Sequence, residues 1–380
     1  MSQDLKTLGD GQIWDLKGVS THAPLETFED LFSGRALGRM AREKRKVFSA
    51  FKEKGKITGL SVTKALLSKN LKAKNTAKVL LEELAKNAVR GIEILSQGGG
   101  FKENWTEKER NYWKNPDLVI IGGGVSKAET GRFLVSCIRR YLSQNGFSRL
   151  QIRQAKFPGK EAGFLGAVIN IIQLICSAAK KRGLKVIGGI GIDLGREEIG
   201  VGLLAVNSSS GKILKHKNQY WLFRSATRTP KRKYLKNFSD TRLGYTQKEE
   251  KRGKRIRLII LEQIADLILK AQRQAQKIGL ACSKDLGVAV PGTTLPSGFI
   301  LNSTDYLPFF RKKDGFNFAR SLEKILAQKH LPGQKVHIVN DGIAAGMANA
   351  YFNHLKTRQQ KFAFLGVGSG LGGCVGIRRL

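Results

Sequence analysis

Aspartates and glycine-rich turns that follow apolar, strand-like runs are the residues of this 380-residue chain best suited to phosphate chemistry. The pair Asn340-Asp341 ends the run QKVHIVND, and Asp193 and Gly195 end the run IGGIGIDLG. Because open α/β sheets bind ligands at the carboxyl ends of their strands, both aspartates are expected where a substrate arrives. A carboxylate at position 341 could accept a hydroxyl proton during phosphoryl transfer. The purely structural alternative is that Asp341 caps the helix that follows.

Two further glycine turns follow strand-like runs. Gly122–Gly124 lie in IIGGGVS, and the segment VGSGLGG contains glycines at positions 368, 370 and 373 with the spacing of a dinucleotide fingerprint. That fingerprint needs a following helix. The residues after Gly373 read as a strand, so a Rossmann site is disfavoured and a phosphate-holding hairpin, with the hydroxyl of Ser369 as an added donor, is the better interpretation.

The charge of the chain is its strongest compositional signal. The sequence has 67 Lys and Arg against 30 Asp and Glu, a formal net charge of +37, which favours affinity for polyanions such as nucleic acid, polyphosphate or an anionic surface. The stretch from Lys212 to Arg257 is especially basic, and its interleaved aromatic residues would suit stacking on unpaired bases. The alternative is a solvated insertion in a generally lysine-rich protein.

Cysteine and histidine spacing argues against a metal or disulfide framework. The four cysteines occur singly and no histidine shares a metal-ligand pattern with another, which predicts reduced thiols and no zinc. The sequence also shows neither a secretory signal nor an apolar run of membrane-spanning length. We therefore expect a cytoplasmic protein without a membrane partner.

The elements that must position these residues are read from periodicity. Apolar residues three to four apart predict helices through most of residues 29–97, and strand and helix patterns alternate from there on. The longest helical pattern is RIRLIILEQIADLILKAQRQAQKIG. Alternation of this kind predicts an α/β layer, and a chain of this length suits two domains with a cleft between them.

Together the aspartate and glycine segments resemble the ROK family of sugar kinases and related repressors, within the actin-like ATPase superfamily. The resemblance covers most of the chain, but with the halves exchanged: FEDLFSGRAL, PDLVIIGGGVS and KEAGFLGAVIN come first, and GIDLG, VAVPG, VNDGIAAG and GVGSGLGGC follow. It implies an α/β, two-lobed actin-like (ribonuclease H-like) fold, circularly permuted, with the cleft between lobes. The larger lobe would comprise residues 1–158 plus 361–380, and the smaller lobe residues 159–360.

The resemblance also implies roles for the matching residues. Asp341 would be the catalytic base that deprotonates a sugar hydroxyl, with Asn340 beside it on the sugar. Asp193 would orient Mg²⁺ through water, and Glu29 and Asn302 would contact the sugar. The ATP phosphates would be held by Gly195 and by Gly368, Ser369, Gly370, Gly372 and Gly373, and adenosine would lie against Gly122, Gly123 and Gly124.

Departures from the family pattern concentrate in the first phosphate loop. The family reads D-x-G-G-T where this chain has Asp193, Leu194, Gly195, Arg196 and Glu197. Replacing a hydroxyl by a carboxylate removes a hydrogen bond worth about 1.5 to 3 kcal/mol. It also adds roughly 1 to 4 kcal/mol of repulsion about 4 Å from a phosphate, unless Arg196 or magnesium offsets it.

Other family features are altered or missing. The segment E-x-G-H that grips the sugar has only a degraded counterpart in GQIWDL, with Gln12 and Asp15, or in His22. The cysteine-rich zinc loop and the helix-turn-helix of the repressor branch are not found in the sequence, so a repressor is disfavoured.

The sequence therefore predicts an ATP- and Mg²⁺-dependent sugar kinase, glucokinase-like, acting on a hexose or amino sugar. One alternative is a non-catalytic relative that binds sugar or nucleotide. Another is a protein that binds nucleic acid or polyphosphate through the basic stretch Lys212–Arg257. Which sugar is used, which phosphate donor is used, and whether the chain forms a homo-oligomer stay open.

Overall fold

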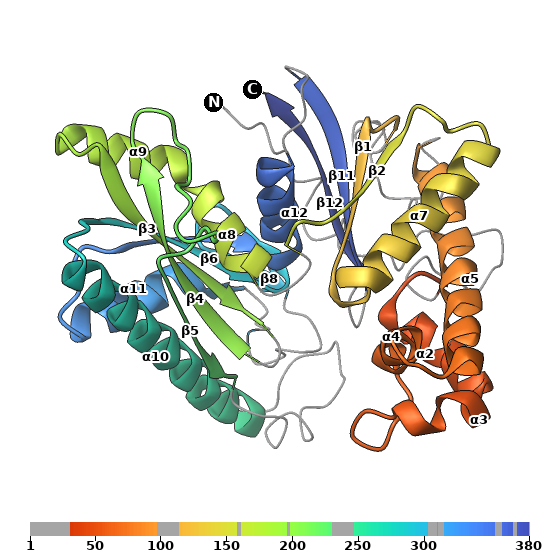
Figure 1. The fold of residues 1–380 in the computed structure, drawn as a ribbon. Coiled ribbons are helices and arrows are strands. Elements are labelled where there is room, and N and C mark those ends of the chain that lie inside the picture. Colours follow the sequence, from red (N-terminus) through yellow and green to blue (C-terminus); the bar gives the residue numbers. More distant parts are fainter. Residues whose placement is uncertain are drawn as a thin grey trace. The chain divides into compact units, whose positions relative to one another are not determined.

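The structure is a computed structural model of the whole chain, and it describes residues 31–96, 114–157, 161–195, 198–229, 247–302, 310, 315–353, 359–367 and 371–379. The chain divides into two compact units. Unit 1 comprises Met1–Gly159 and Asn349–Leu380, and unit 2 comprises Lys160–Ala348 (Figure 1). Each unit combines helices with a sheet, so the expected mixed α/β fold is confirmed.

Unit 1 begins with a helical block whose apolar residues recur every three or four positions. In the long helix α5 the buried residues include Ala77, Leu81, Leu84 and Ala88, and the helix packs against α7, α4 and α2. The described elements of the unit are α2 (Gly34–Glu43), α3 (Arg45–Phe48), η2 (Ser49–Phe51), α4 (Gly59–Leu66), α5 (Leu71–Ser96), β1 (Leu118–Gly122), η3 (Gly124–Ser126), α7 (Ala128–Gln144), β2 (Gln151–Gln154), β11 (Gln359–Val367) and β12 (Leu371–Arg379).

The sheet of unit 1 has the order β12-β11-β1-β2. Strand β11 forms an antiparallel hairpin with β12 and pairs in parallel with β1, which pairs in parallel with β2. Strand β1 is a fully apolar run, and β11 is apolar from Phe362 to Val367, as expected for strands covered on both faces. Within the described residues the first strand of the chain, β1, thus pairs with the second-to-last one, β11.

Unit 2 is built around a five-stranded sheet of order β10-β6-β3-β4-β5. Strands β3, β4 and β5 form an antiparallel meander, and β6 and β10 run parallel to β3. Its elements are α8 (Glu161–Asn170), α9 (Ile172–Lys181), β3 (Val186–Leu194), β4 (Glu198–Asn207), β5 (Phe223–Arg228), α10 (Gln247–Lys277), β6 (Cys282–Val290), β7 (Thr293–Thr294), β8 (Phe299–Asn302), β9 (Phe316–Asn317), α11 (Phe318–Gln328) and β10 (Lys335–Asn340).

Helices cover both faces of this sheet (Figure 1). The apolar stripe of α10 packs with α11 over one face and forms a core with Leu286, Val288 and Ile338. Helix α8 lies on the other face, where Gly191 and Gly287 let its backbone approach the strands closely. Helix α12 (Asp341–Phe352) follows β10, and its last residues, from Asn349 on, belong to unit 1.

Among the described residues no single helix combines the length and apolar composition needed to cross a membrane. Helices α8 and α9 meet those criteria only as a pair, bent by 54° at the break between them.

Candidate active site

Asp341 lies where the sequence predicts it, directly after β10 and at the first position of α12. Its side chain is half-buried, and this burial raises the pKa of its carboxyl to about 6, although the N–H of Gly342 donates to Oδ1 at 2.9 Å and opposes the shift. A carboxyl with this pKa is ionised at neutral pH and is still basic enough to accept a proton from a substrate hydroxyl.

Asn340 is buried and serves the structure around Asp341. Its Oδ1 accepts the N–H groups of Gly342 at 2.6 Å and Ile343 at 3.3 Å, so Asn340, rather than Asp341 alone, caps α12. Its Nδ2 donates to the carbonyl of Gly292 at 2.8 Å. Asn340 therefore ties the helix start to the Pro291-Gly292 turn, and the expected contact with a sugar stays a prediction.

Asp193 and Asp341 lie at the same end of the sheet, where the parallel strands β3 and β10 end. Asp193 is the penultimate residue of β3, and it is in register with Ala289 of β6, while Asn340 is in register with the next residue, Val290. Since β10 and β3 are separated only by β6, the two aspartates are about 10 Å apart across the sheet.

Helix α8 packs against both aspartate-bearing segments. A Cβ atom on Gly163 would lie 2.5 Å and 2.7 Å from the carboxylate oxygens of Asp193. One turn later, a Cβ on Gly166 would overlap the backbone of Ala344 in α12. These glycines lie in KEAGFLGAVIN, one of the segments that carry the family resemblance, but the sequence-based prediction gives them no contact with the site. The spacing of small residues in AGFLGA is the signal that could have suggested close packing.

Magnesium fits the residue predicted to orient it. Mg²⁺ keeps several waters and binds proteins through one or two carboxylates. Asp193 presents a half-buried carboxylate at a strand end, next to backbone rather than bulky side chains at Gly163. Among the described residues there is no group of three or more His, Cys, Asp or Glu side chains that could hold a metal directly.

Gly195 serves the β3–β4 hairpin. Its N–H donates to the carbonyl of Glu198 at 3.0 Å, and its own carbonyl accepts the hydroxyl of Thr229 at 2.8 Å. Arg196 and Glu197, the residues that depart from the family pattern, lie outside the described residues. The phosphate contact of Gly195 stays a prediction.

In the glycine turn of unit 1, two glycines are required by packing and the third is not. Gly122 faces the ring of Phe364, and Gly123 has φ +85° and lies against the backbone of Val367, so neither position has room for a Cβ. Gly124 is exposed, and a Cβ there would meet nothing within 4 Å. Packing thus explains the first two glycines, and Gly124 is the position open to a ligand.

The remaining predicted residues are described only in part. In the β11–β12 hairpin Gly372 pairs with Gly366 and Gly373 with Leu365, and Asn302 ends β8 in register with Thr293. The other four predicted residues lie outside the described part of the chain: Glu29, Gly368, Ser369 and Gly370.

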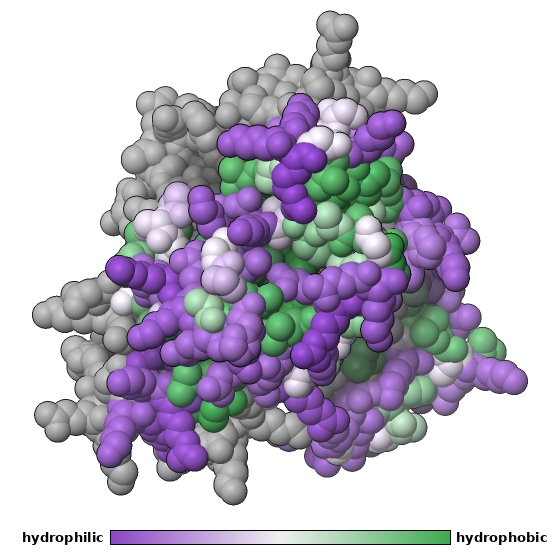
Figure 2. All heavy atoms as spheres, turned by 90° about the vertical axis from the view of Figure 1, so that its left-hand side faces the viewer, coloured by the Kyte–Doolittle hydropathy of each residue, from purple (hydrophilic) through white to green (hydrophobic). Residues whose placement is uncertain are grey.

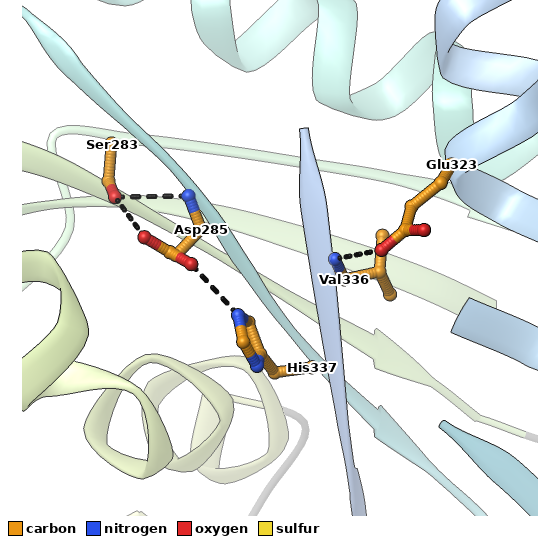
Figure 3. Close-up of polar contacts among 5 residues, drawn as sticks. All are labelled: Ser283, Asp285, Glu323, Val336 and His337. Atoms are coloured by element: carbon orange, nitrogen blue, oxygen red, sulfur yellow. Dashed lines mark hydrogen bonds and ion pairs between the residues drawn. The ribbon is translucent and has the colours of Figure 1, made fainter. Parts of the chain in front are cut away.

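A second polar cluster lies at the opposite ends of the strands in unit 2 (Figure 3). Asp285 Oδ1 lies 2.9 Å from Nε2 of His337, and the hydroxyl of Ser283 accepts the backbone N–H of Asp285 at 3.1 Å. Because these residues lie near the starts of β6 and β10, whereas Asp341 follows the end of β10, the cluster does not join the candidate site.

Comparison with known proteins adds little to this geometry. No family model and no curated protein sequence matches the chain. The solved structure of a ROK hexokinase from Thermus thermophilus aligns with a TM-score of 0.29 and 21% identity over 50% of this chain and 46% of its own. An inorganic polyphosphate/ATP-glucomannokinase from Arthrobacter sp. strain KM aligns with a TM-score of 0.31 and 20% identity over 50% of this chain and 58% of its own.

The chain thus spans about half the length of these two proteins. Alignments this partial leave the assignment of an activity to the residues of the site.

Proposed function

We propose that this chain is an ATP-dependent kinase of a sugar hydroxyl, acting on a hexose or amino sugar, with Asp341 as general base. The observation that carries the proposal is the placement of two carboxylates at one edge of one sheet. Asp341 has a pKa raised to about 6, and Asp193 is the penultimate residue of β3, which lies two strands from β10. Perturbed carboxyls at the carboxyl ends of strands are typical of active sites in α/β proteins.

In the proposed reaction Asp341 takes the proton of the sugar hydroxyl while the hydroxyl oxygen bonds to the γ-phosphorus of ATP. The bond from that phosphorus to the β,γ-bridging oxygen breaks, and ADP leaves with the electron pair. Mg²⁺, when bound, neutralises charge on the phosphate oxygens. Asp193 would hold it through water, and Asn340 keeps the base in place through its bonds to α12 and Gly292.

Strand order supports the proposed circular permutation. In space, β12-β11-β1-β2 of unit 1 corresponds to β4-β3-β6-β10 of unit 2: a hairpin followed by two strands parallel to its inner member. Along the chain the hairpin of unit 2 comes before its parallel strands, whereas the hairpin of unit 1 comes after them. Joining the old ends of a two-lobed kinase and cutting it after the second hairpin would produce this order. We propose lobes of 1–158 plus 361–380 and of 159–360, and a cleft between them.

A kinase assay over a panel of hexoses and amino sugars tests the function. For the sugar that is phosphorylated, Asp341→Asn is expected to lower kcat by about 10²- to 10⁴-fold, the range for loss of a general base. Asp285→Asn, which removes a carboxylate at the other edge of the same sheet, is the matched control and should leave kcat within about threefold.

Two results would contradict the proposal. Activity retained by Asp341→Asn would remove the assigned base. ATP binding measured by calorimetry, with no phosphorylation of any sugar in the panel, would favour a non-catalytic nucleotide-binding protein.

A further inference from the structure

We propose that unit 2 binds the phosphate backbone of duplex nucleic acid on a surface at the end of its sheet where the parallel strands begin, opposite the end that carries Asp341. This surface, called the basic edge below, consists of the exposed side chains of Arg182, Lys185, Lys212, Lys277, Lys284 and Lys335. The proposal is independent of the kinase activity, because none of these residues belongs to the candidate active site.

The topology brings these six residues together although they span more than 150 positions in the sequence. Strand β3 begins at Val186, β4 ends at its register partner Asn207, and β6 and β10 begin at Cys282 and Lys335. The segments that enter or leave these strands therefore lie at one edge of one sheet. Each of these four segments, residues 180–186, 207–212, 276–285 and 328–335, contributes at least one exposed Lys or Arg side chain.

Hydrogen bonds join neighbouring segments of the basic edge. The guanidinium of Arg182 donates to the carbonyl of Cys282 at 3.1 Å, which connects the start of β3 to the start of β6. Ser208 donates its N–H to the carbonyl of Lys185 at 3.0 Å, which connects the turn after β4 to β3. Hydrogen bonds thus connect the backbone segments that carry these cations.

The turns that follow the helices are held by backbone hydrogen bonds. Helices α9, α10 and α11 are each followed, two residues after their last residue, by a residue with left-handed backbone: Gly183, Gly279 and His330, with φ between +63° and +66°. In each case the following N–H bonds back across the helix end, as from Leu184 to the carbonyl of Ala179 at 3.0 Å. A fixed backbone leaves only the side chains to be ordered when a regular array of phosphates binds.

Cations outnumber carboxylates on the basic edge. Within residues 180–186, 207–212, 276–285 and 328–335 the acidic residue is Asp285, which is half-buried and bonded to His337 (Figure 3). Two carboxylates reach these segments from neighbouring helices: Glu323 accepts the N–H of Val336 at 2.9 Å, and Asp266 pairs with Lys329 at 2.6 Å. Figure 2 views the molecule from the side where Figure 1 draws α9 and α11, and hydrophilic side chains cover much of the described surface there. The carboxylates of the candidate active site lie at the other edge of the sheet.

The size of the basic edge suits a duplex. From β10 to β4 the sheet crosses three strand spacings, about 14 Å. Duplex DNA carries one phosphate charge per roughly 1.7 Å of axis with both strands counted, so about eight charges occur along that length and a part of them faces the protein. The four segments contain no Phe, Tyr or Trp on which unpaired bases could stack, which disfavours a single strand. Their one strongly exposed large apolar side chain is Ile278, too little for insertion into a membrane.

Helix ends account for only part of this charge. Lysines in the last turn of a helix interact favourably with its carbonyl end, and Lys277 is in that position. Lys185, Lys212, Lys284 and Lys335 are not in helices, so this explanation does not apply to them. They are the residues to test.

The test compares two variants with the same loss of charge. One carries Lys185→Gln, Lys212→Gln, Lys284→Gln and Lys335→Gln, and the matched control replaces four exposed lysines of unit 1, Lys52, Lys69, Lys72 and Lys78, by Gln. Binding of a fluorescein-labelled 20-base-pair DNA duplex of arbitrary sequence is followed by fluorescence anisotropy over a series of KCl concentrations. Thermal unfolding of each variant shows that it is folded.

We expect the wild-type affinity to fall steeply with salt, and the basic-edge variant to bind at least tenfold more weakly. Its slope of log K against log [salt] should be smaller by about 3 to 4, close to one unit for each phosphate that the variant no longer neutralises. The unit 1 variant should stay within about threefold of the wild type.

Several outcomes would overturn the proposal: equal weakening in both variants, no salt-dependent binding by the wild type, or preference for a single strand of the same length. Stronger binding to phosphatidylserine vesicles or to polyphosphate of matched charge than to the duplex would assign the surface to another polyanion and overturn it as well.

Discussion

The two units carry their predicted site residues for different physical reasons. In the turn of unit 1, Gly122 and Gly123 are required by the fold, because Phe364 and Val367 occupy the space of a side chain. In unit 2 burial disfavours the charged form of Asp341, and Asn340 already caps the helix that Asp341 begins. The charged form of Asp341 therefore destabilises the folded protein at neutral pH, and its role at the start of the helix does not offset this cost. Such a residue is better evidence of function than a glycine whose presence packing explains.

The largest expected effect is a difference in stability between substitutions at two neighbouring glycines of the unit 1 turn, Gly123 and Gly124. Gly123→Ala should destabilise the protein by about 2 to 4 kcal/mol, since alanine is strained at φ +85° and its methyl group meets the Val367 backbone. Gly124→Ala is the matched control, expected within about 0.5 kcal/mol because its methyl group points into open space. Urea denaturation of both variants measures the difference.

The same pair of variants sharpens the ligand prediction. If adenosine lies against this turn, Gly124→Ala should weaken ATP binding, measured by calorimetry, without changing stability. Equal stability of the two variants would show that the packing argument for Gly123 is wrong. Unchanged ATP affinity in Gly124→Ala would show that the turn does not contact the nucleotide.

The cost of Asp341 can be measured directly as stability. Its pKa is about 6 in the folded protein against an ordinary 3.8, so the contribution of Asp341 to stability is most favourable below pH 4, where the carboxyl is protonated in both states. That stability is lost as the pH rises from about 4 to 6. Asp341→Asn should therefore stabilise the protein by up to about 3 kcal/mol at pH 7.5, and by almost nothing at pH 4.

Urea denaturation of wild type and Asp341→Asn at both pH values tests this expectation. Asp285→Asn is the control with the opposite sign, because it removes a carboxylate that is bonded to His337 at 2.9 Å. Destabilisation by Asp341→Asn at pH 7.5 would mean that the carboxylate supports the fold, and the contrast between the two units would then fail.

The sequence predicts the layers of this fold well, because periodicity reports burial directly. Continuous apolar runs such as LVIIG became central strands, and the three-to-four spacing of residues 71–96 became α5. Pairing of β1 with β11 joins residues more than 240 positions apart. Local patterns carry no information on such pairing, and only the order of the motifs suggested it.

Within the candidate site, the sequence located side chains but not their partners. The position of Asp341 follows from a strand pattern that ends in a polar pair. The bond from Asn340 to Gly292 and the contact of Gly163 with Asp193 depend on tertiary packing across distant segments. Gly195 illustrates the limit, because its spacing suggests phosphate binding whereas its N–H bonds to Glu198 within the hairpin.

Gly163 connects the packing of unit 2 to its chemistry. Gly163→Ala places a methyl group against the carboxylate of Asp193, so the carboxylate must move or rotate. We expect binding of Mn²⁺ in the presence of ATP, measured by electron paramagnetic resonance, to weaken by about tenfold, or about 1.4 kcal/mol. Gly200→Ala, at the register partner of Asp193 but with open space around its Cβ, should bind Mn²⁺ normally. Equal Mn²⁺ affinity in the two variants would remove Asp193 from the metal site.

The smallest effect concerns the rate rather than the structure. A general base acts only when it is deprotonated, so kcat/KM should be level above pH 7 and fall about tenfold per pH unit below pH 6, following the pKa of Asp341. Gly163→Ala should leave this acid limb near pH 6, because Asp193 is two strands away from Asp341. A limb near pH 4 in the wild type would mean that Asp341 is not held in a buried site during catalysis. A limb that moves with Gly163→Ala would assign the titration to Asp193 rather than to Asp341.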